Sequence, residues 1–297
     1  MDFFDPQNKR SVLKVYLSIL LDNICSFKQR HTDGEYRLMF RGQPSTNFPV
    51  LPSAFRDNNI QKEALMIKEL KRFAPQEFSS CASQLECLIK MQHYGLPTRL
   101  LDVTFNPLVA LFFACYDKQY QDQYGVVYTF ADYIHSHEEP IIERNAMLAT
   151  YSGSTPEELS KHIHVRTNLC APDGSPDKDA LRHLFGKEYY AIAPPLNNER
   201  IRRQQGAFLL FGLNFAEPFQ KKEFAINYPG KIDDDIINLL GILPDHKDAV
   251  LNELDSIGIN PSFLFPELEH QADYIKRKYC FPSKNTVNDQ QRKEAQP

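Results

Sequence analysis

The chain has 297 residues, of which 42% are hydrophobic and 24% charged, the composition of a folded globular protein rather than a disordered one. Its formal net charge of −4 argues against broad non-specific binding to nucleic acids, whose phosphates require an excess of Lys and Arg. No apolar run approaches the ~20 residues that span a bilayer. The N-terminus lacks the basic and apolar regions of a signal peptide, so we expect a cytoplasmic protein with no membrane association.

Cysteine and glycine usage excludes several classes of site. The six cysteines form no C-x-x-C pair and no Cys/His spacing typical of zinc, so we predict no metal and no disulfide framework. With 12 glycines, the chain contains neither G-x-G-x-x-G nor the P-loop pattern. The ordinary kinase, NTPase and Rossmann classes are therefore excluded.

The first half of the chain alternates helical and extended patterns, read from hydrophobic spacing and from Gly and Pro breaks. In chain order we predict a helix at 11–27, a strand at 36–41, an irregular segment at 45–58, helices at 63–73 and 79–94, a strand at 98–102, a helix at 107–116 and a strand at 125–130.

The second half is less regular. Two short helices are expected within 131–180, then a strand at 189–193, a helix at 197–205, strands at 206–211 and 224–228, a helical pattern from 233 onward with helices at 245–257 and 267–279, and a disordered tail at 283–297. Together these elements predict an α+β fold, with a central mixed or antiparallel sheet, flanking helices and a helical C-terminal region.

Two short islands differ from ordinary core sequence. In the first, Phe40-Arg41-Gly42-Gln43, a strand runs into an arginine and a glycine, which would present the guanidinium fork to a phosphate or a carboxylate. The second island, residues 92–107, contains seven polar side chains able to donate, accept or titrate between a helix, a strand and a helix. Loops on a rigid scaffold build functional sites in this way.

The same residues resemble a known family. Phe40-Arg41-Gly42, the run 93–104 (HYGLPTRLLDVT) and the run 106–114 (NPLVALFFA) are similar to the FRG domain, which is named for its Phe/Tyr-Arg-Gly motif; the runs 198–208 and 264–268 match its usual downstream pattern. The resemblance covers roughly residues 30–280. It implies one FRG-type domain over 1–282, with an N-terminal helix at 9–30, a motif-bearing core at 35–230 and a C-terminal helical part at 231–282.

A second resemblance bears on chemistry. The layout is similar to that of ADP-ribosyltransferases, in which a first-strand Arg or His holds NAD, a Ser/Thr strand supports the nicotinamide pocket and a late Glu or Gln orients the ribose. Arg41 matches the first position, Thr104 with 106–110 the second, and Gln204-Gln205-Gly206 lies near the third. Because Gln204 and Gln205 occupy the place of the catalytic Glu, Asp102 or Glu199 would supply the carboxylate.

The resemblances therefore imply an NAD-dependent ADP-ribosyltransferase or NAD glycohydrolase with NAD as its substrate. The candidate catalytic residues are Arg41, His93, Asp102, Glu199 and Gln205. The candidate NAD-binding residues are Arg41, Gly42, Gln43, Tyr94, Thr98, Arg99, Thr104 and Asn106. FRG proteins are mostly bacterial and many look like mobile-element or anti-phage defence proteins, which implies a toxin or defence effector, with an antitoxin or defence-system partner and a protein or nucleic-acid acceptor.

Two alternatives from other classes stay open. In a nucleic-acid-binding or RNA-processing module, Tyr94 would stack on a base and arginines would contact phosphates: Arg41, Arg99, Arg200, Arg202 and Arg203. In a non-catalytic sensor, the same polar cluster would bind a phage component.

Overall fold

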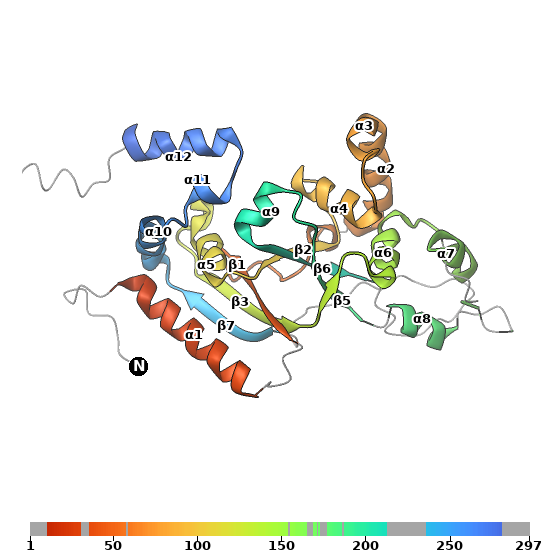
Figure 1. Ribbon diagram of the computed structural model, residues 1–297, viewed down its shortest axis with the longest axis horizontal. Helices are drawn as coiled ribbons and strands as arrows, with labels where there is room; N and C mark the ends of the chain where they lie inside the picture. Colours follow the sequence, from red (N-terminus) through yellow and green to blue (C-terminus); the bar gives the residue numbers. More distant parts are fainter. Residues whose placement is uncertain are drawn as a thin grey trace, which may run out of the picture.

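The computed structural model describes residues 11–30, 36–57, 59–153, 155–164, 169–170, 172, 177–185, 187–212 and 236–280. Over these residues the fold is α+β, as predicted from the sequence (Figure 1). The strands are β1 (Arg37–Gln43), β2 (Leu100–Thr104), β3 (Gly125–Asp132), β4 (Ile134–Ser136), β5 (Tyr189–Ala193), β6 (Gly206–Phe211) and β7 (Ile236–Ile242). They form one sheet in the order β4-β5-β6-β2-β1-β3-β7, antiparallel except for the parallel pair β4 and β5.

The sheet is weakly joined at its centre. β1 pairs with β3 over seven residues and β2 pairs with β6 over five, but β1 and β2 share a single bridge, Phe40 with Thr104. The sheet thus consists of two well-paired parts, β1-β3-β7 and β2-β6-β5-β4, that meet at one point.

The helices come between and after the strands. They are α1 (Val12–Arg30), α2 (Glu63–Phe73), α3 (Pro75–Phe78), α4 (Gln84–His93), α5 (Pro107–Tyr116), α6 (Pro140–Met147), α7 (Pro156–His162), α8 (Lys178–Phe185), α9 (Glu199–Gln204), α10 (Lys247–Ser256), α11 (Pro261–Leu264) and α12 (Leu268–Cys280). Short polar residues begin three of those near the centre: the side chains of Ser83, Asn106 and Asn198 accept backbone N–H groups at the starts of α4, α5 and α9.

Helix α5 lies unusually close to the sheet because glycines face it. A β-carbon on Gly42 would lie 1.8 Å from the carbonyl oxygen of Ala110, and one on Gly125 would lie 2.4 Å from that of Ala114. Both contacts are far shorter than any van der Waals distance. The glycine of the Phe-Arg-Gly motif is therefore required by the packing of α5 on β1.

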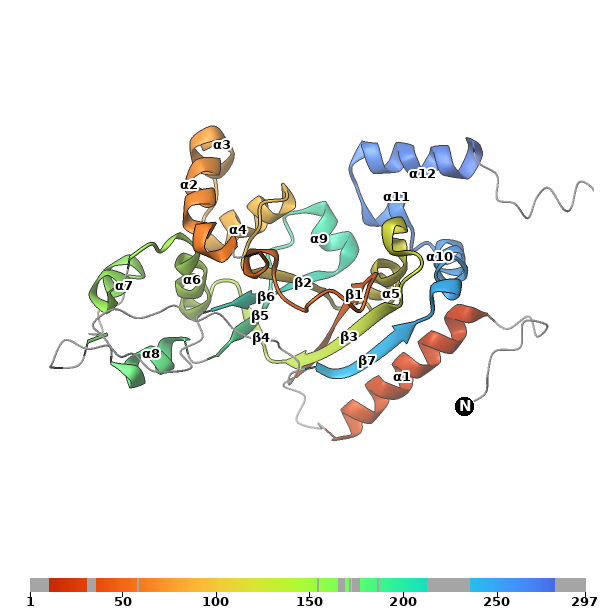
Figure 2. The same cartoon turned by 180° about the vertical axis from the view of Figure 1, so that it is seen from behind.

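Three core clusters surround the sheet. Helices α1, α5 and α10 pack with Phe40 and Val127, while α4, α6 and α9 pack with Leu100 and Phe208. The third cluster joins inward residues of β1, β2, β3, β5 and β6 to the segment around Val50. Figure 2 shows the sheet from behind, with α1 beside β7 at one end and α6, α7 and α8 at the other.

Several elements differ from the prediction. β2 begins two residues later than expected, and β4 was missed within 131–180. The two short helices expected in that range are α6 and α7, and α8 begins at its end. The helical pattern from 233 onward was wrong for β7, whose exposed Ile237 and Leu239 give apolar residues on both faces and hide the alternation of a strand. The expected strand at 224–228 and tail at 283–297 lie outside the described residues. No helix among the described residues combines the length and hydrophobicity needed to cross a membrane.

Candidate functional site

A cleft of about 310 Å³ opens where β1 and β2 separate. It brings together side chains from four regions that are distant in sequence: β1, the end of α4, β2 with the start of α5, and α9 with the start of β6. Its walls are formed by Phe40, Arg41, Gly42, Ile89, Gln92, His93, Asp102, Val103, Thr104, Val109, Phe113, Asn198, Arg200, Ile201, Gln204, Gly206, Ala207 and Phe208.

Arg41 spans the gap between the two central strands. Its Nη1 donates to the backbone carbonyl of Asp102 at 2.7 Å. The Gln43 amide, in the orientation that satisfies its neighbours, accepts from Arg41 Nε at 3.1 Å and donates to the carbonyl of Phe48 at 3.2 Å. Burial lowers the pKa of Arg41 to about 10, although the Asp102 carboxylate acts in the opposite direction, so the guanidinium stays charged at neutral pH.

Asp102 is the one carboxylate among the residues that line the cleft, and a chain of hydrogen bonds fixes it. Gln92 Nε2 donates to Asp102 Oδ2 at 2.8 Å, and Thr98 Oγ1 donates to Gln92 Oε1 at 2.5 Å. Thr98 is fully buried, whereas Asp102 is exposed. The buried hydroxyl therefore orients the amide, and the amide orients the carboxylate.

Thr104 joins three elements beneath the cleft. Its Oγ1 donates to the carbonyl of Gln204 at 2.6 Å and accepts from the backbone N–H of Asn106 at 3.0 Å. The end of β2, the end of α9 and the start of α5 are held together by this one hydroxyl. Asn106 itself accepts from the backbone N–H of Leu108 at 2.9 Å and caps α5, outside the cleft lining.

Arg200 brings a second guanidinium to the cleft, from the first turn of α9. It lies over the ring of Phe265, 5.0 Å from the centroid, and no described residue accepts a hydrogen bond from it. A cation held on an aromatic face keeps its N–H groups available for a ligand.

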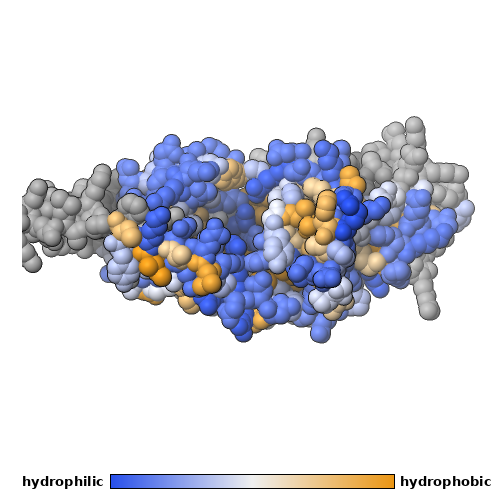
Figure 3. All heavy atoms as spheres, turned by 90° about the horizontal axis from the view of Figure 1, so that it is seen from above, coloured by the Kyte–Doolittle hydropathy of each residue, from blue (hydrophilic) through white to orange (hydrophobic). Residues whose placement is uncertain are grey.

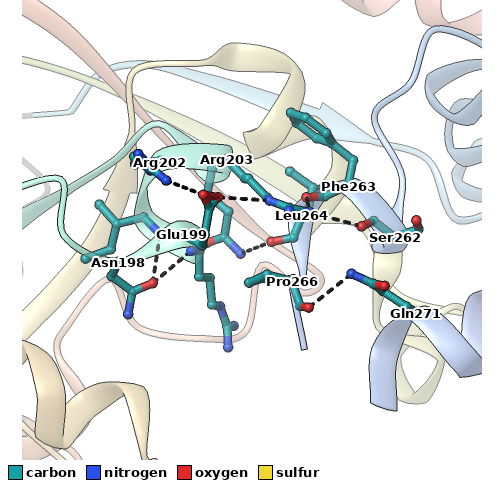
Figure 4. Close-up of polar contacts among 12 residues, drawn as sticks. Asn198, Glu199, Arg202, Arg203, Ser262, Phe263, Leu264, Pro266 and Gln271 are labelled. Atoms are coloured by element: carbon teal, nitrogen blue, oxygen red, sulfur yellow. Dashed lines mark hydrogen bonds and ion pairs between the residues drawn. The ribbon is translucent and has the colours of Figure 1, made fainter. Parts of the chain in front are cut away.

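The short helix α9 is fastened to the C-terminal part of the chain. Arg203 Nη1 donates to the carbonyls of Ser262 and Phe263, as Figure 4 shows, and Gln204 Nε2 donates to that of Leu264 at 3.1 Å. These bonds fix the side of the cleft that carries Arg200.

His93, the last residue of α4, stands between this cleft and a second cavity of about 320 Å³. Its Nε2 lies 4.0 Å from Glu267 Oε1. Tyr94 lines the second cavity rather than the first and is 64% exposed, with its ring in edge contact with that of His93 at 5.3 Å.

Some predicted site residues have structural positions instead. Arg99 is 3% exposed and forms a buried ion pair with Glu63, and its Nη1 also donates to the carbonyl of Phe211. Gln43, Thr98 and Asn106 support the cleft from outside its lining, whereas Gly42 both lines the cleft and allows the close packing of α5.

Two further predicted catalytic residues do not line the cleft. The Glu199 carboxylate is paired with Arg202 and Arg203, which lower its pKa by hydrogen bonding. Gln205 ends α9 in the left-handed region, at φ 47°, and is exposed. The cleft thus contains Arg41, His93 and Asp102 but neither Glu199 nor Gln205.

Two residues that line the cleft, Gln92 and Arg200, were not predicted as site residues of the leading hypothesis. Gln92 opens the polar run 92–107 but was not among the candidate site residues, although an amide at an otherwise apolar helix position is the signal for a polar role. Arg200 was assigned only to the nucleic-acid alternative. The spacing of Glu199 to Arg202 and Arg203, three and four residues, is that of ion pairs on a helix and identifies Arg200 as the unpaired member of the run.

The cleft combines cationic side chains with one carboxylate. Two guanidinium groups and an imidazole can bind phosphate oxygens, while Asp102 can accept from hydroxyls or stabilise positive charge. Phe40, Phe113 and other apolar side chains complete the walls. Within the described ranges, no three His, Cys, Asp or Glu side chains gather as a metal site requires.

Comparison with known proteins gives one match. The family model of the FRG domain matches residues 36–123, which run from the start of β1 past the end of α5 and include Arg41, His93 and Asp102. The match is shorter than the resemblance over roughly 30–280 and leaves α9 and Arg200 outside. No curated protein and no solved structure matches the chain. Residues 36–123 are therefore similar to the FRG domain family, as the motif-bearing runs predict.

Proposed function

We propose that this protein binds NAD in the central cleft and cleaves its nicotinamide–ribose bond, acting as an ADP-ribosyltransferase or an NAD glycohydrolase. The observation that carries the proposal is the geometry of one cleft, in which two guanidinium groups, each with N–H donors that no described residue accepts, share the walls with an oriented carboxylate. A dinucleotide offers the complementary groups: a diphosphate, ribose hydroxyls and a cationic pyridinium ring.

Arg41 and Arg200 are the diphosphate ligands in this proposal. Arg41 uses Nε and Nη1 to span the strands, and no described residue takes the N–H groups of its Nη2. The N–H groups of Arg200 likewise donate to no described residue. Planar guanidinium groups bind phosphate through paired hydrogen bonds, which an ammonium cannot reproduce.

Asp102 is the group that acts on the ribose. When the C1′–N bond breaks, its electron pair leaves with nicotinamide and positive charge develops on the ribose ring. A carboxylate fixed beside that charge lowers the barrier because it needs no reorganisation at the moment of reaction. The Thr98–Gln92–Asp102 chain supplies the fixed orientation.

The nucleic-acid alternative finds less support in the same residues. Arg99 is buried against Glu63, Arg202 pairs with Glu199, and Arg203 is bound to Glu199 and to two backbone carbonyls. Of the five arginines that would contact phosphates, Arg41 and Arg200 remain, and both line the central cleft. Figure 3 shows the face that carries α12 as largely hydrophilic, with separate hydrophobic patches.

In the cell, we propose a toxin or defence effector that consumes NAD or transfers ADP-ribose to a protein or nucleic-acid acceptor. Expression of the wild-type chain should then arrest growth and deplete NAD, and an antitoxin or defence partner would restrain it.

The direct test is nicotinamide release from NAD by the purified chain. Asp102→Asn keeps the size of the side chain and removes its charge, so turnover should fall by about 100-fold or more. Arg41→Lys should raise the KM for NAD, since the paired contact is lost. Asp22→Asn, at an exposed position on α1, is the matched control and should behave as wild type.

Wild-type protein that neither binds nor turns over NAD would refute the proposal. Salt-sensitive binding of single-stranded RNA that is lost in Arg41→Lys and Arg200→Lys would then favour the nucleic-acid alternative.

A further inference from the structure

Glu267 is a carboxylate that the proposed function does not yet use. It lies at the start of α12, and its Oε1 is 4.0 Å from His93 Nε2, which is an ion-pair distance rather than a hydrogen bond. Its Oε2 is buried and has no hydrogen-bond partner among the described residues. A buried carboxylate oxygen without a donor is uncommon and calls for an explanation.

The position of Glu267 is fixed by its neighbours. Three residues before it, the Leu264 carbonyl accepts from Gln204 of α9, and the Phe265 ring packs in the core beneath Arg200. The same bonds that hold α9 against the cleft therefore hold Glu267 against His93. A hydrogen bond between His93 Nε2 and Glu267 Oε1 requires the 4.0 Å separation to shorten by about 1 Å.

A simpler role would be capping of α12, but the contacts do not fit it. The backbone carbonyl of Glu267 accepts from the N–H of Gln271, while neither carboxylate oxygen accepts from a described backbone N–H of α12. The carboxylate is instead directed to the one imidazole that lines both cavities.

We propose that Glu267 is a positioning residue: it accepts the N–H of His93 Nε2 and so leaves the lone pair on Nδ1. If the proposed function holds, on which this step rests, His93 serves as the general base of the transfer step. The nucleophile, a water or an acceptor hydroxyl, forms its bond to C1′ and gives its proton to Nδ1. The C1′–N bond breaks, and nicotinamide leaves with the electron pair.

This pairing resembles in logic the carboxylate–imidazole unit of many hydrolases, where the carboxylate selects the tautomer and the far nitrogen moves the proton. It also assigns a role to the second cavity, which His93 shares with the cleft: an acceptor bound there would meet the same imidazole.

The first test needs no activity. ¹⁵N chemical shifts of His93, assigned by their loss in His93→Gln, should show the Nε2–H tautomer at alkaline pH, where an ordinary imidazole is neutral. Glu267→Leu removes both acceptor oxygens and should shift the signals toward a mixture of tautomers. Glu269→Leu, two residues further along and exposed, is the matched control and should leave them unchanged. If the Leu variant does not fold, Glu267→Gln keeps one acceptor and should retain the tautomer.

The second test is kinetic. Glu267→Leu should lower kcat for nicotinamide release by about 10-fold with little change in KM, and His93→Gln by about 100-fold or more. In the His93→Gln background, Glu267→Leu should cause no further loss, because it acts through the missing imidazole.

The outcomes separate the two proposals. The role of Glu267 would be overturned if the ¹⁵N chemical shifts of His93 were unchanged in Glu267→Leu. It would also be overturned if the double variant lost more kcat than His93→Gln alone. A wild-type chain without NAD turnover would overturn the proposed function and the proton-transfer step with it, while the tautomer measurement would still decide whether Glu267 holds His93.

Discussion

Replacing Gly42 by alanine tests how the family motif is built into the fold. The new β-carbon would lie 1.8 Å from the Ala110 carbonyl oxygen and 2.7 Å from the Ala114 backbone nitrogen. An ordinary contact needs about 3.3 Å, so α5 or β1 must move by roughly 1.5 Å. The obstacle is helix backbone and cannot rotate away as a side chain would.

The magnitude follows from what α5 buries. Six of its ten residues are fully or almost fully buried, and a displacement of this size weakens most of their contacts. Overpacking by a methyl group in a core usually costs about 1–3 kcal/mol. Because backbone rather than side chain must yield, we expect Gly42→Ala to lower the free energy of unfolding by about 3–5 kcal/mol, a large fraction of the total stability of a typical domain.

Two other glycines provide controls for the denaturant titration. Gly241→Ala, within β7, meets nothing within 4 Å and should stabilise the protein by up to about 0.5–1 kcal/mol. Gly95→Ala also has open space but sits at φ +85°, so only its backbone strain of about 1 kcal/mol should appear. A loss in Gly42→Ala no larger than that in Gly95→Ala would refute the close-packing argument.

Three more predictions concern the core and the cleft. Leu111→Ala removes a fully buried side chain and should cost about 2–5 kcal/mol in the same titration; a smaller loss would mean that α5 readily collapses into the cavity. Gln92→Leu leaves the buried Thr98 hydroxyl without its acceptor and should cost about 1–3 kcal/mol of stability. It should also lower nicotinamide release by about 10-fold, since it frees Asp102; equal turnover would show that the carboxylate needs no orientation. Burial raises the pKa of the Cys115 thiol to about 12, so its contribution to stability is full below the ordinary thiol value of about 8.5 and declines as pH rises toward 12. Between pH ~9 and ~11 the stability of wild type should therefore fall relative to Cys115→Ala by up to about 1.4 kcal/mol per pH unit, and parallel pH profiles would contradict this.

The α+β class and most of the helices were predictable because their signals are local. The apolar spacing of α1 and the Asn106-Pro107 start of α5 fix those helices without tertiary information. β7 was not predictable in the same way: its exposed Ile237 and Leu239 break the alternation, and its pairing with β3 depends on residues more than 100 positions away.

The site was predictable in part. A strand end with Arg-Gly and a dense polar run identified Arg41, His93 and Asp102, which share the cleft. The local signal could not tell that Arg99, three residues before Asp102, turns inward to the distant Glu63. Nor could it place Glu267 beside His93, because that proximity depends on α9 binding the segment that precedes α12.

The single bridge between β1 and β2 also bears on how a ligand is admitted. Separating the two parts of the sheet there breaks one backbone pair and the Arg41 bond to Asp102, whereas separating β1 from β3 would break seven pairs. At about 1 kcal/mol net for each hydrogen bond, local opening is far cheaper along this line than elsewhere in the sheet. Amide hydrogens of Gly42 and Val103 should accordingly exchange with solvent before those of the flanking strands. The cleft of about 310 Å³ is then a lower bound on the space available to a ligand. A longer ligand can enter when β1 and β2 separate locally.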